Sequence, residues 1–382
     1  METLSSGTNR EKNNVFLAIR DIRFAKGRFA MMGGVVALIT LLLVMLSGLT
    51  AGLAEQSTSA IGKLGAGAAA PVDTVVFGAP GSGTPKASYT ESSVTAAQAE
   101  SWRSRPGVRA AEPVGITQSR AQGAAAGAGT TNVAVFGVAP GSGLAPVDVS
   151  AGTAVVGASV AEALTLQQGD ALAISGVELT VAAVVEDQWY AHTSVVWTAL
   201  PAWSRLAHVS DGGQLATVIA VTYQDGAAVD EAAADAAANT VSASRTDSFQ
   251  ALGSFKSENG SLTLMQAFLY GISSLVIVAF LTVWTIQRTR DIAVLKAMGA
   301  PGPYILRDAI TQAAIVLLAG AGLGGFAGVL AGRVAAQAAP FLLSPATTLL
   351  PVVGIVALGL AGAALAVRRV TKVDALLALG GN

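Results

Sequence analysis

Residues 29–54 read FAMMGGVVALITLLLVMLSGLTAGLA, a stretch without a single Asp, Glu, Lys or Arg. A helix of about 20 apolar residues spans the hydrocarbon core of a bilayer, so this run is long enough to cross a membrane. Three further charge-free runs occupy residues 259–287, 309–332 and 334–367. Because 52% of the residues are apolar and only 12% are charged, the sequence predicts a membrane protein with four transmembrane helices.

The charged residues are divided unevenly along the chain. Residues 55–258 hold 9 Lys and Arg against 18 Asp and Glu, whereas the rest of the chain holds 14 against 6. Basic residues cluster before the first charge-free run, between the second and third, and after the fourth. Loops rich in Lys and Arg remain in the cytoplasm. We therefore expect a multi-pass protein of the cell membrane with both termini in the cytoplasm and the acidic segment outside.

The predicted fold class is four transmembrane helices plus one α+β extracytoplasmic domain inserted between helices 1 and 2. Residues 14–28 mix apolar and basic residues at helical spacing, which fits an interfacial helix against lipid phosphates or a cytosolic extension of the first membrane helix. The expected boundaries are 1–28 for a cytoplasmic N-terminus with the interfacial helix, 29–54, 261–287, 305–335 and 346–367 for the transmembrane helices, 55–260 for the domain, 288–304 for a cytoplasmic coupling loop and 368–382 for the cytoplasmic C-terminus.

The sequence of the inserted domain predicts a mixture of strands and helices. Short runs of branched and aromatic residues predict strands at 73–77, 132–136, 177–185 and 217–223. We expect helices at 95–104, 158–166 and 227–238. The echo FGAPGSG at 77–83 and FGVAPGSG at 136–143 predicts a turn after each of two strands, and neither copy has the lysine of a nucleotide-binding loop.

Glycines recur at four-residue steps in the third predicted helix. Small residues at this spacing let another helix backbone approach closely. The contact could be a moving one, but we favour static packing. The glycines are Gly320, Gly324, Gly328 and Gly332.

The sequence contains no convincing catalytic constellation. There is no cysteine, there are only two histidines, and no Gly-x-Ser-x-Gly elbow occurs. We expect no catalytic residue, no metal site and no nucleic-acid partner.

The stretch QRTRDIAVLKAMGA at residues 287–300 directly follows the second membrane run. Its apolar residues recur at helical spacing and the pattern stops at Gly299, which predicts a short amphipathic helix on the cytoplasmic side. Such a helix can dock into a groove on a soluble partner, although an ordinary basic loop would also satisfy the charge pattern.

This stretch resembles the cytoplasmic loop of the FtsX-like permeases of ABC transporters, the MacB or type VII architecture. The family has a first helix, a large external domain and three further helices. Its loop reads Arg-x-x-(Glu/Asp)-Ile-x-x-Leu-(Lys/Arg)-Ala-(Met/Leu/Ile)-Gly-Ala, and the closing segment RRVTKVDALLAL at 368–379 is also similar, with Asp374 where the family usually has Pro. The resemblance implies that the residues coupled to the ATPase are Arg288, Arg290, Asp291, Ile292, Leu295, Lys296, Met298 and Gly299.

Within that family the chain is most similar to the haem-exporter permeases of Gram-positive bacteria, the HrtB type, on residues 16–30, 281–300 and 378–381. The resemblance implies a homodimer in the lipid bilayer bound to two copies of an ABC ATPase subunit, which would bind the ATP and Mg. The permease would not itself be an enzyme, and haem would be a transported substrate rather than a permanently bound cofactor. The alternatives are an FtsX-like signal relay to an extracellular cell-wall enzyme, or export of lipid or peptide.

Cargo ligands are expected near the outer membrane surface or in the domain. No membrane run carries a charge, which favours lateral entry of cargo from the outer leaflet or handling by the domain. Haem iron accepts His, Met, Tyr or carboxylate-type ligands. Each candidate also has an ordinary interpretation, as lipid-facing packing, an interfacial carboxylate or domain core. The candidates are Met45, Leu49, Glu258, Met265, Tyr190 and His192.

Overall fold

The computed structural model describes residues 26–66, 71–123, 129–209, 213–287, 294, 298 and 301–371. The chain divides into two compact units, which we treat separately. The helical unit comprises Met1–Gly52 and Ser261–Asn382, and the sheet unit comprises Leu53–Gly260.

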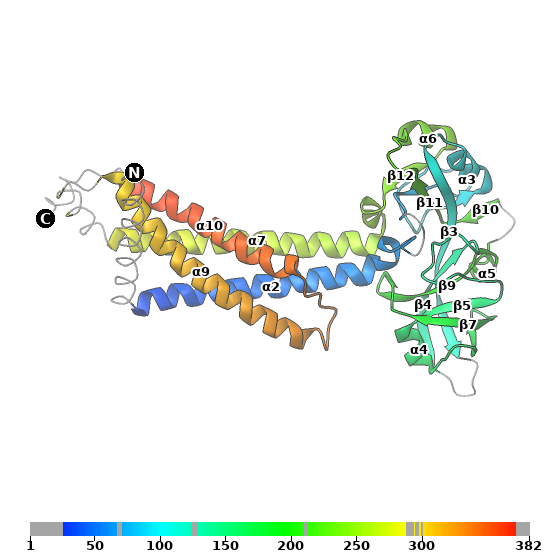
Figure 1. Ribbon diagram of the computed structural model, residues 1–382, viewed down its shortest axis with the longest axis horizontal. Helices are drawn as coiled ribbons and strands as arrows, with labels where there is room; N and C mark the ends of the chain where they lie inside the picture. Colours follow the sequence, from blue (N-terminus) through cyan, green and yellow to red (C-terminus); the bar gives the residue numbers. More distant parts are fainter. Residues whose placement is uncertain are drawn as a thin grey trace, which may run out of the picture. The chain divides into compact units, whose positions relative to one another are not determined.

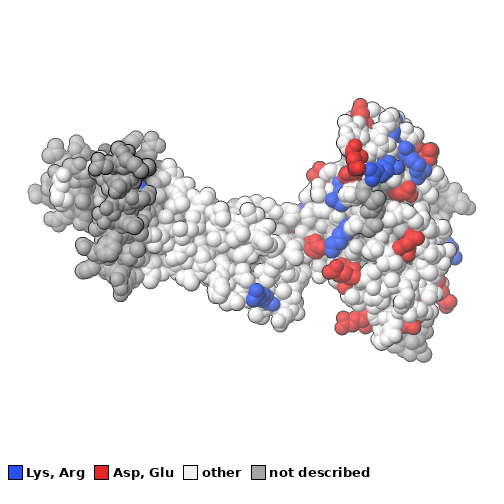
Figure 2. Space-filling view, viewed as in Figure 1, with Lys and Arg blue, Asp and Glu red and all other residues white. Residues whose placement is uncertain are grey.

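The helical unit is made of long apolar helices (Figure 1). Four helices in the described part of the chain are long and apolar enough to cross a membrane, as the charge-free runs predict. On the face shown in Figure 2, the described surface of this unit carries few charged side chains, whereas charged side chains are frequent on the sheet unit. The helices are α2 (Lys26–Gly62), α7 (Gly253–Gln287), α9 (Gly302–Ala335) and α10 (Pro345–Thr371).

Two of these helices extend beyond the charge-free runs that predict them. Helix α2 continues past Ala54 to Gly62, and α7 begins at Gly253, so the last part of α2 and the first turns of α7 belong to the sheet unit. Pro345 opens α10, as expected from its position, but Pro351 lies inside the helix. Pro345 needs no N–H because the first four N–H groups of a helix have no intrahelical partner, whereas Pro351 lies beyond them and removes the helical hydrogen bond to the carbonyl of Thr347.

All four helices contribute to one apolar core in the helical unit. Helices α2 and α9 supply most of its buried side chains, and α7 and α10 complete it. Its fully buried members are Met32, Val36, Leu43, Ile277, Leu281, Ala313, Val316, Leu317, Ala321, Ile355 and Ala363.

The sheet unit is α+β, as predicted. Its described strands form a 10-stranded sheet in the order β12-β1-β11-β3-β4-β9-β5-β7-β6, with β8 paired to β9, and a separate pair β10-β2. The strands are β1 (Thr74–Phe77), β2 (Val94–Thr95), β3 (Val108–Gly123), β4 (Thr130–Val138), β5 (Thr153–Gly157), β6 (Ala171–Ile174), β7 (Val177–Val185), β8 (Trp189–Tyr190), β9 (Thr193–Ala199), β10 (Gln214–Ala216), β11 (Val218–Tyr223) and β12 (Val241–Ser244).

Strand β3 joins two lobes of this unit. Its first half pairs with β11, and its second half pairs with both β4 and β6, so the path from β3 through β4, β9, β5 and β7 to β6 closes on itself. Short helices flank the strands, and α3 and α6 pack on the lobe that contains β1 and β11. The helices are α3 (Ala96–Arg103), α4 (Ala158–Leu164), α5 (Leu200–Leu206) and α6 (Glu231–Ala238), followed by the 3-10 turn η1 (Asp247–Ala251).

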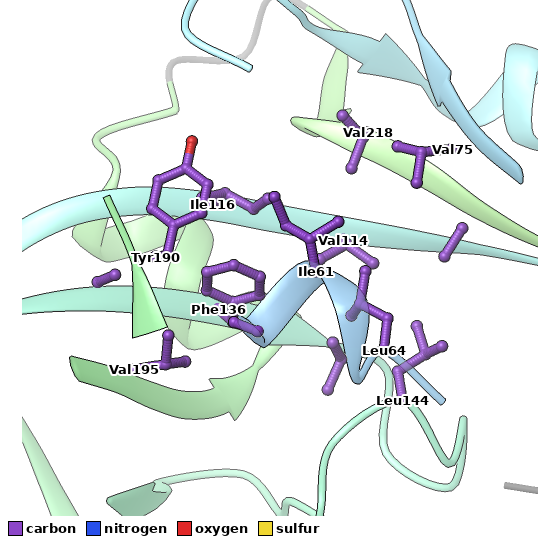
Figure 3. Packing of buried hydrophobic residues seen from close by; sticks show 14 of the residues in the cluster. Ile61, Leu64, Val75, Val114, Ile116, Phe136, Leu144, Tyr190, Val195 and Val218 are labelled. Atoms are coloured by element: carbon purple, nitrogen blue, oxygen red, sulfur yellow. The ribbon is translucent and has the colours of Figure 1, made fainter. Parts of the chain in front are cut away.

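The end of α2 is part of the core of the sheet unit (Figure 3). Ile61 and Leu64 are 0% and 1% exposed, and they belong to one apolar cluster with Val114 and Phe136 of the central strands. Burial of such a side chain contributes about 1.5–3 kcal/mol. The charge-free run ends at Ala54, but the helix continues because its last turns bury apolar side chains against the sheet.

Candidate functional site

A tight hairpin in the sheet unit carries one of the expected cargo residues. Strands β8 and β9 are joined through Ala191 and His192, whose φ angles are +48° and +62°. A two-residue turn with positive φ at both positions is the type I′ turn, which matches the twist of paired strands. Neither residue is glycine, so the hairpin holds both in a backbone region that is sparsely populated by L residues.

The backbone of this hairpin is bonded to α2. The N–H of Ala191 donates to the carbonyl of Ser57, and the N–H of His192 donates to the carbonyl of Gln56, each at 3.0 Å. The N–H of Trp189 donates to the hydroxyl of Ser59 at 2.8 Å. Three hydrogen bonds therefore attach the hairpin to the last turns of α2.

The side chain of His192 connects the hairpin to α7 as well. Its Nε2 lies 2.8 Å from Oε2 of Glu258 and 3.2 Å from Oγ of Ser57. A carboxylate accepts, so Nε2 carries the hydrogen and donates to Glu258. We call Ser57, His192 and Glu258 the His192 clasp. Because the His192 and Glu258 side chains are 33% and 39% exposed, the pair contributes at most about 1 kcal/mol to stability.

Tyr190 lies in the core rather than in the clasp. Its ring is 5.9 Å from that of Tyr89 and 5.5 Å from that of Phe136, and the residue is 5% exposed. Burial raises the pKa of the Tyr190 phenol well above its usual value, because the phenolate would lose its hydration. The phenol stays neutral, and its place in this structure is that of a packing residue.

The remaining cargo candidates lie on α2 and α7 within the helical unit. Met45 and Leu49 are half-buried, whereas Met265 is 56% exposed. Nε2 of Gln266 donates to Oγ1 of Thr50 at 3.1 Å, which brings the two helices together at this level. The candidates thus form two sets, His192 with Glu258 in one unit and Met45, Leu49 and Met265 in the other. Among the described residues, no group of three or more His, Cys, Asp or Glu side chains could hold a metal ion.

The glycine face of α9 lies against α2. A methyl group at Gly320 would lie 2.8 Å from the carbonyl oxygen of Gly33, and one at Gly324 would overlap the backbone of Ala37. At Gly328 it would lie 2.8 Å from Val44. The backbones of the two helices are therefore in contact, as the four-residue spacing predicts. Gly332 instead faces Phe341, in the segment that follows α9.

The segment that follows α9 also packs against small residues of α2. Gly48 lies against the ring of Phe341, and Gly52 against the backbone of Pro340. The N–H of Leu342 donates to the carbonyl of Gly48 at 3.0 Å. Small residues four apart on α2 suggest a contact with another helix, but in this structure they pack against the connection between α9 and α10.

Most of the expected coupling residues lie outside the described part of the chain: Arg288, Arg290, Asp291, Ile292, Leu295, Lys296 and Gly299. Met298 is described and 71% exposed, and Val294 is 47% exposed. The N–H of Met298 donates to the carbonyl of Val294 at 3.0 Å, the spacing of one helical turn.

Ser57 is a member of the clasp that the sequence reasoning missed. It lies in the polar run Glu55-Gln56-Ser57-Thr58-Ser59 after the first apolar stretch. Ser57, Thr58 and Ser59 are all buried. A cluster of small polar residues that keeps helical register past a membrane run is a signal that the helix continues into protein rather than into water.

The sequence matches known families over most of its length. Residues 28–239 match the MacB-like periplasmic core domain, and residues 251–375 match the FtsX-like permease C-terminal region. A four-helix membrane unit with this inserted α+β domain is the membrane-spanning subunit of an ABC transporter. The chain belongs to the MacB and FtsX type of ABC transporter permeases.

Among individual relatives, a Staphylococcus epidermidis protein named as a hemin transport system permease, HrtB, is 29% identical over 131 residues. That match covers 34% of this chain and only 37% of the relative. The HrtB of Staphylococcus haemolyticus is 32% identical over 130 residues, with the same shares of each chain. An uncharacterized ABC transporter permease of Mycobacterium tuberculosis is 26% identical over 383 residues, 96% of this chain and 99% of that protein.

Solved structures that resemble the chain include the periplasmic region of MacB from Actinobacillus actinomycetemcomitans, with a TM-score of 0.33 and 11% identity over 49% of this chain and 92% of that one. The extracellular domain of the ABC-type transporter YknZ from Gram-positive bacteria has a TM-score of 0.29 and 14% identity over 41% and 84% of the two chains.

Proposed function

We propose that this permease expels a hydrophobic or amphipathic molecule from the membrane, and that the cargo is haem. The observation that carries the proposal is the His192 clasp. It places an imidazole and a carboxylate, both ligand types that haem iron accepts, together where α7 begins. The similarity to proteins named as hemin transport permeases supports the same cargo, over the part of the chain that it covers.

The attachments of the hairpin suggest how ATP-driven movement would reach this site. The turn is bonded to Gln56 and Ser57 of α2, and His192 is bonded to Glu258 of α7. A rotation or shift of either helix would strain or break these bonds. In our proposal, the ATPase partner pushes on the loop at Met298 on the cytoplasmic side, the helices rearrange, and the clasp opens. Two copies of the permease would provide two clasps.

Haem binding would require the clasp to open. Oε2 of Glu258 is occupied by His192, so a ligand bond from this oxygen, or from Nε2, to iron would replace the hydrogen bond between them. Exposed ion pairs are weak, so the exchange costs little.

The test is titration of the full-length protein in lipid nanodiscs with ferric haem, followed in the Soret band. We expect a saturable shift that Glu258→Gln and His192→Gln weaken. Glu178→Gln removes an exposed carboxylate of β7 and is the matched control. An unchanged Soret band in the wild-type protein would exclude haem.

Signal relay to an extracellular partner is the second candidate function, because the same attachments would carry movement of α2 and α7 into the sheet unit. In that case, cross-linking from the sheet unit in intact cells would capture a cell-wall enzyme, and haem would neither shift the Soret band nor stimulate the ATPase. Stimulation of the ATPase by lipid or peptide in place of haem would instead indicate export of those molecules.

A further inference from the structure

Two polar cavities adjoin each other in the sheet unit. The first, of about 500 Å³, is lined in part by Ser159, Trp189 and His192, and the second, of about 440 Å³, by Gln118 and Arg120. Both are lined by Asn132 and Thr193, so they share a wall formed by β4 and the start of β9. Cavities of 300–1,000 Å³ are the size of small-molecule sites.

The two cavities differ in charge from the acidic domain that contains them. No Asp or Glu is among the described residues that line either cavity. His192 lines the first cavity, and Arg120 lines the second. Two acids lie directly behind the lining: Glu258, whose Oε2 is 2.8 Å from Nε2 of His192, and Asp187. The Asp187 carboxylate accepts hydrogen bonds from the backbone N–H and hydroxyl of Ser159 and from the hydroxyl of Ser194. The cavities therefore favour an anion over a cation.

Several polar groups of the lining have no partner within the described part of the protein. The Arg120 guanidinium makes no ion pair or hydrogen bond there, and neither do the side chains of Thr131 and Asn132. By contrast, Nε2 of Gln118 donates to Oγ1 of Thr193 at 3.1 Å, which fixes the shared wall. Arg120 and Asn132 are exposed to solvent and Thr131 is half-buried, so all three side chains are available to a ligand at these two surface pockets.

We propose that these cavities bind an acidic sugar, a pyranose that carries a carboxylate. The Arg120 fork suits a carboxylate, and the amide of Asn132 and the hydroxyl of Thr131 suit ring hydroxyls. The half-buried indole of Trp189 offers an apolar face for the sugar ring. Arg120, Thr131 and Asn132 are not among the cargo candidates, so this proposal rests on other residues than the haem proposal, although His192 lines the first cavity.

The test is calorimetric titration of the full-length protein in nanodiscs with methyl β-D-glucuronide. Methyl β-D-glucoside is the uncharged comparison, and inorganic phosphate is the anion without a sugar ring. We expect saturable binding of the glucuronide and at least about tenfold weaker binding of the other two, because a hydrogen bond to a charged group is worth about one decade of affinity or more.

Variants then locate the site. Arg120→Gln should weaken glucuronide binding at least about tenfold, Asn132→Ala should weaken it as well, and Arg120→Lys should bind at an intermediate level because the charge remains but the fork is lost. Arg205→Gln is the matched control, since Arg205 is exposed on α5 and lines neither cavity. Absence of glucuronide binding, equal binding of glucoside or phosphate, or an unchanged affinity in Arg120→Gln would overturn the proposal. Haem titration of the same samples is independent of each of these outcomes.

Discussion

Nε2 of His192 lies 2.8 Å from Oε2 of Glu258, although the two residues are 66 positions apart in the chain. Through this pair and Ser57, a single side chain of a β-hairpin is bonded to both helices that connect the two units of the protein. The relationship predicts that the two residues act as one structural element.

We expect His192→Gln and Glu258→Gln to have non-additive effects on stability. The coupling between them should be about 0.5–1 kcal/mol, because both side chains are partly exposed. Hydrogen exchange at the backbone N–H groups of Ala191 and His192, which donate to α2, should become faster in either variant and no faster in the double variant. Additive effects would mean that the pair does not hold the hairpin.

Contact between α2 and α9 predicts opposite outcomes at two glycines of α9. Gly324→Ala would force a methyl group into the backbone of Ala37, whereas Gly322→Ala would meet nothing within 4 Å. Overpacking typically costs about 1–3 kcal/mol, so Gly324→Ala should lower the unfolding temperature in detergent. Gly322→Ala should leave it unchanged or raise it slightly. Equal effects at the two positions would contradict the packing described here.

The position of Met298 predicts loss of ATPase coupling when it is charged. Met298→Asp should lower stimulation of the partner's ATPase strongly, because a desolvated carboxylate would oppose docking of the apolar face. Leu295→Asp should act in the same way. Ala338→Asp, which adds the same charge to the exposed connection after α9, is the control. Full stimulation by the Met298→Asp, Leu295→Asp double variant would exclude docking through this helix.

The expected orientation can be tested with single cysteines, because the chain has none of its own. Ser150 is exposed in the sheet unit, and Val294 is exposed beyond α7. In intact cells, a membrane-impermeant maleimide should label Ser150→Cys at once and Val294→Cys only after permeabilisation. The reverse pattern would place both termini outside the cell.

Buried tyrosines predict a loss of stability at alkaline pH. Burial raises the pKa of Tyr190 above its ordinary value of about 10. Below pH 10 the phenol is neutral in both the folded and the unfolded states, so it makes no pH-dependent contribution. Above pH 10 the unfolded chain releases a proton that the folded protein retains, so stability falls by about 1.4 kcal/mol per pH unit for each such tyrosine. The unfolding temperature of Tyr190→Phe should therefore fall less than that of the wild type between pH 9 and 11.

The sequence correctly predicts those helices and strands whose capping residues and side-chain types favour the same structure that the folded protein has. For the helix expected at 95–104, the structure has Thr95 and Gln98 in a reciprocal capping box, with Ser104 as the last cap. Strand β7 occupies the same residues that its branched side chains predict. The helix expected from Ala227 starts only at Glu231, because Asp230 accepts from the N–H of Ala233 and fixes the start.

Elements that are stabilised by residues distant in the sequence cannot be predicted from local sequence signals. Strand β3 contains Pro113 and Gly115, which argue against a long strand. In the structure, Gly115 lies directly against the indole of Trp203, where any side chain would overlap the ring. Of the candidate site, His192 and Glu258 are predictable by residue type, but their pairing depends on a turn held by Ser57 and Gln56, for which the sequence has no local signal.

The burial of Ile61, Leu64 and Phe255 in one core has a consequence for biogenesis. Ile61 lies in the last turn of α2, Leu64 just after it and Phe255 in the first turn of α7, so this core of the sheet unit is assembled from both borders of its own segment. During synthesis, this core cannot close until the chain has been translocated through Phe255. The nascent segment must therefore wait, incompletely packed, for the start of the second membrane helix to leave the ribosome.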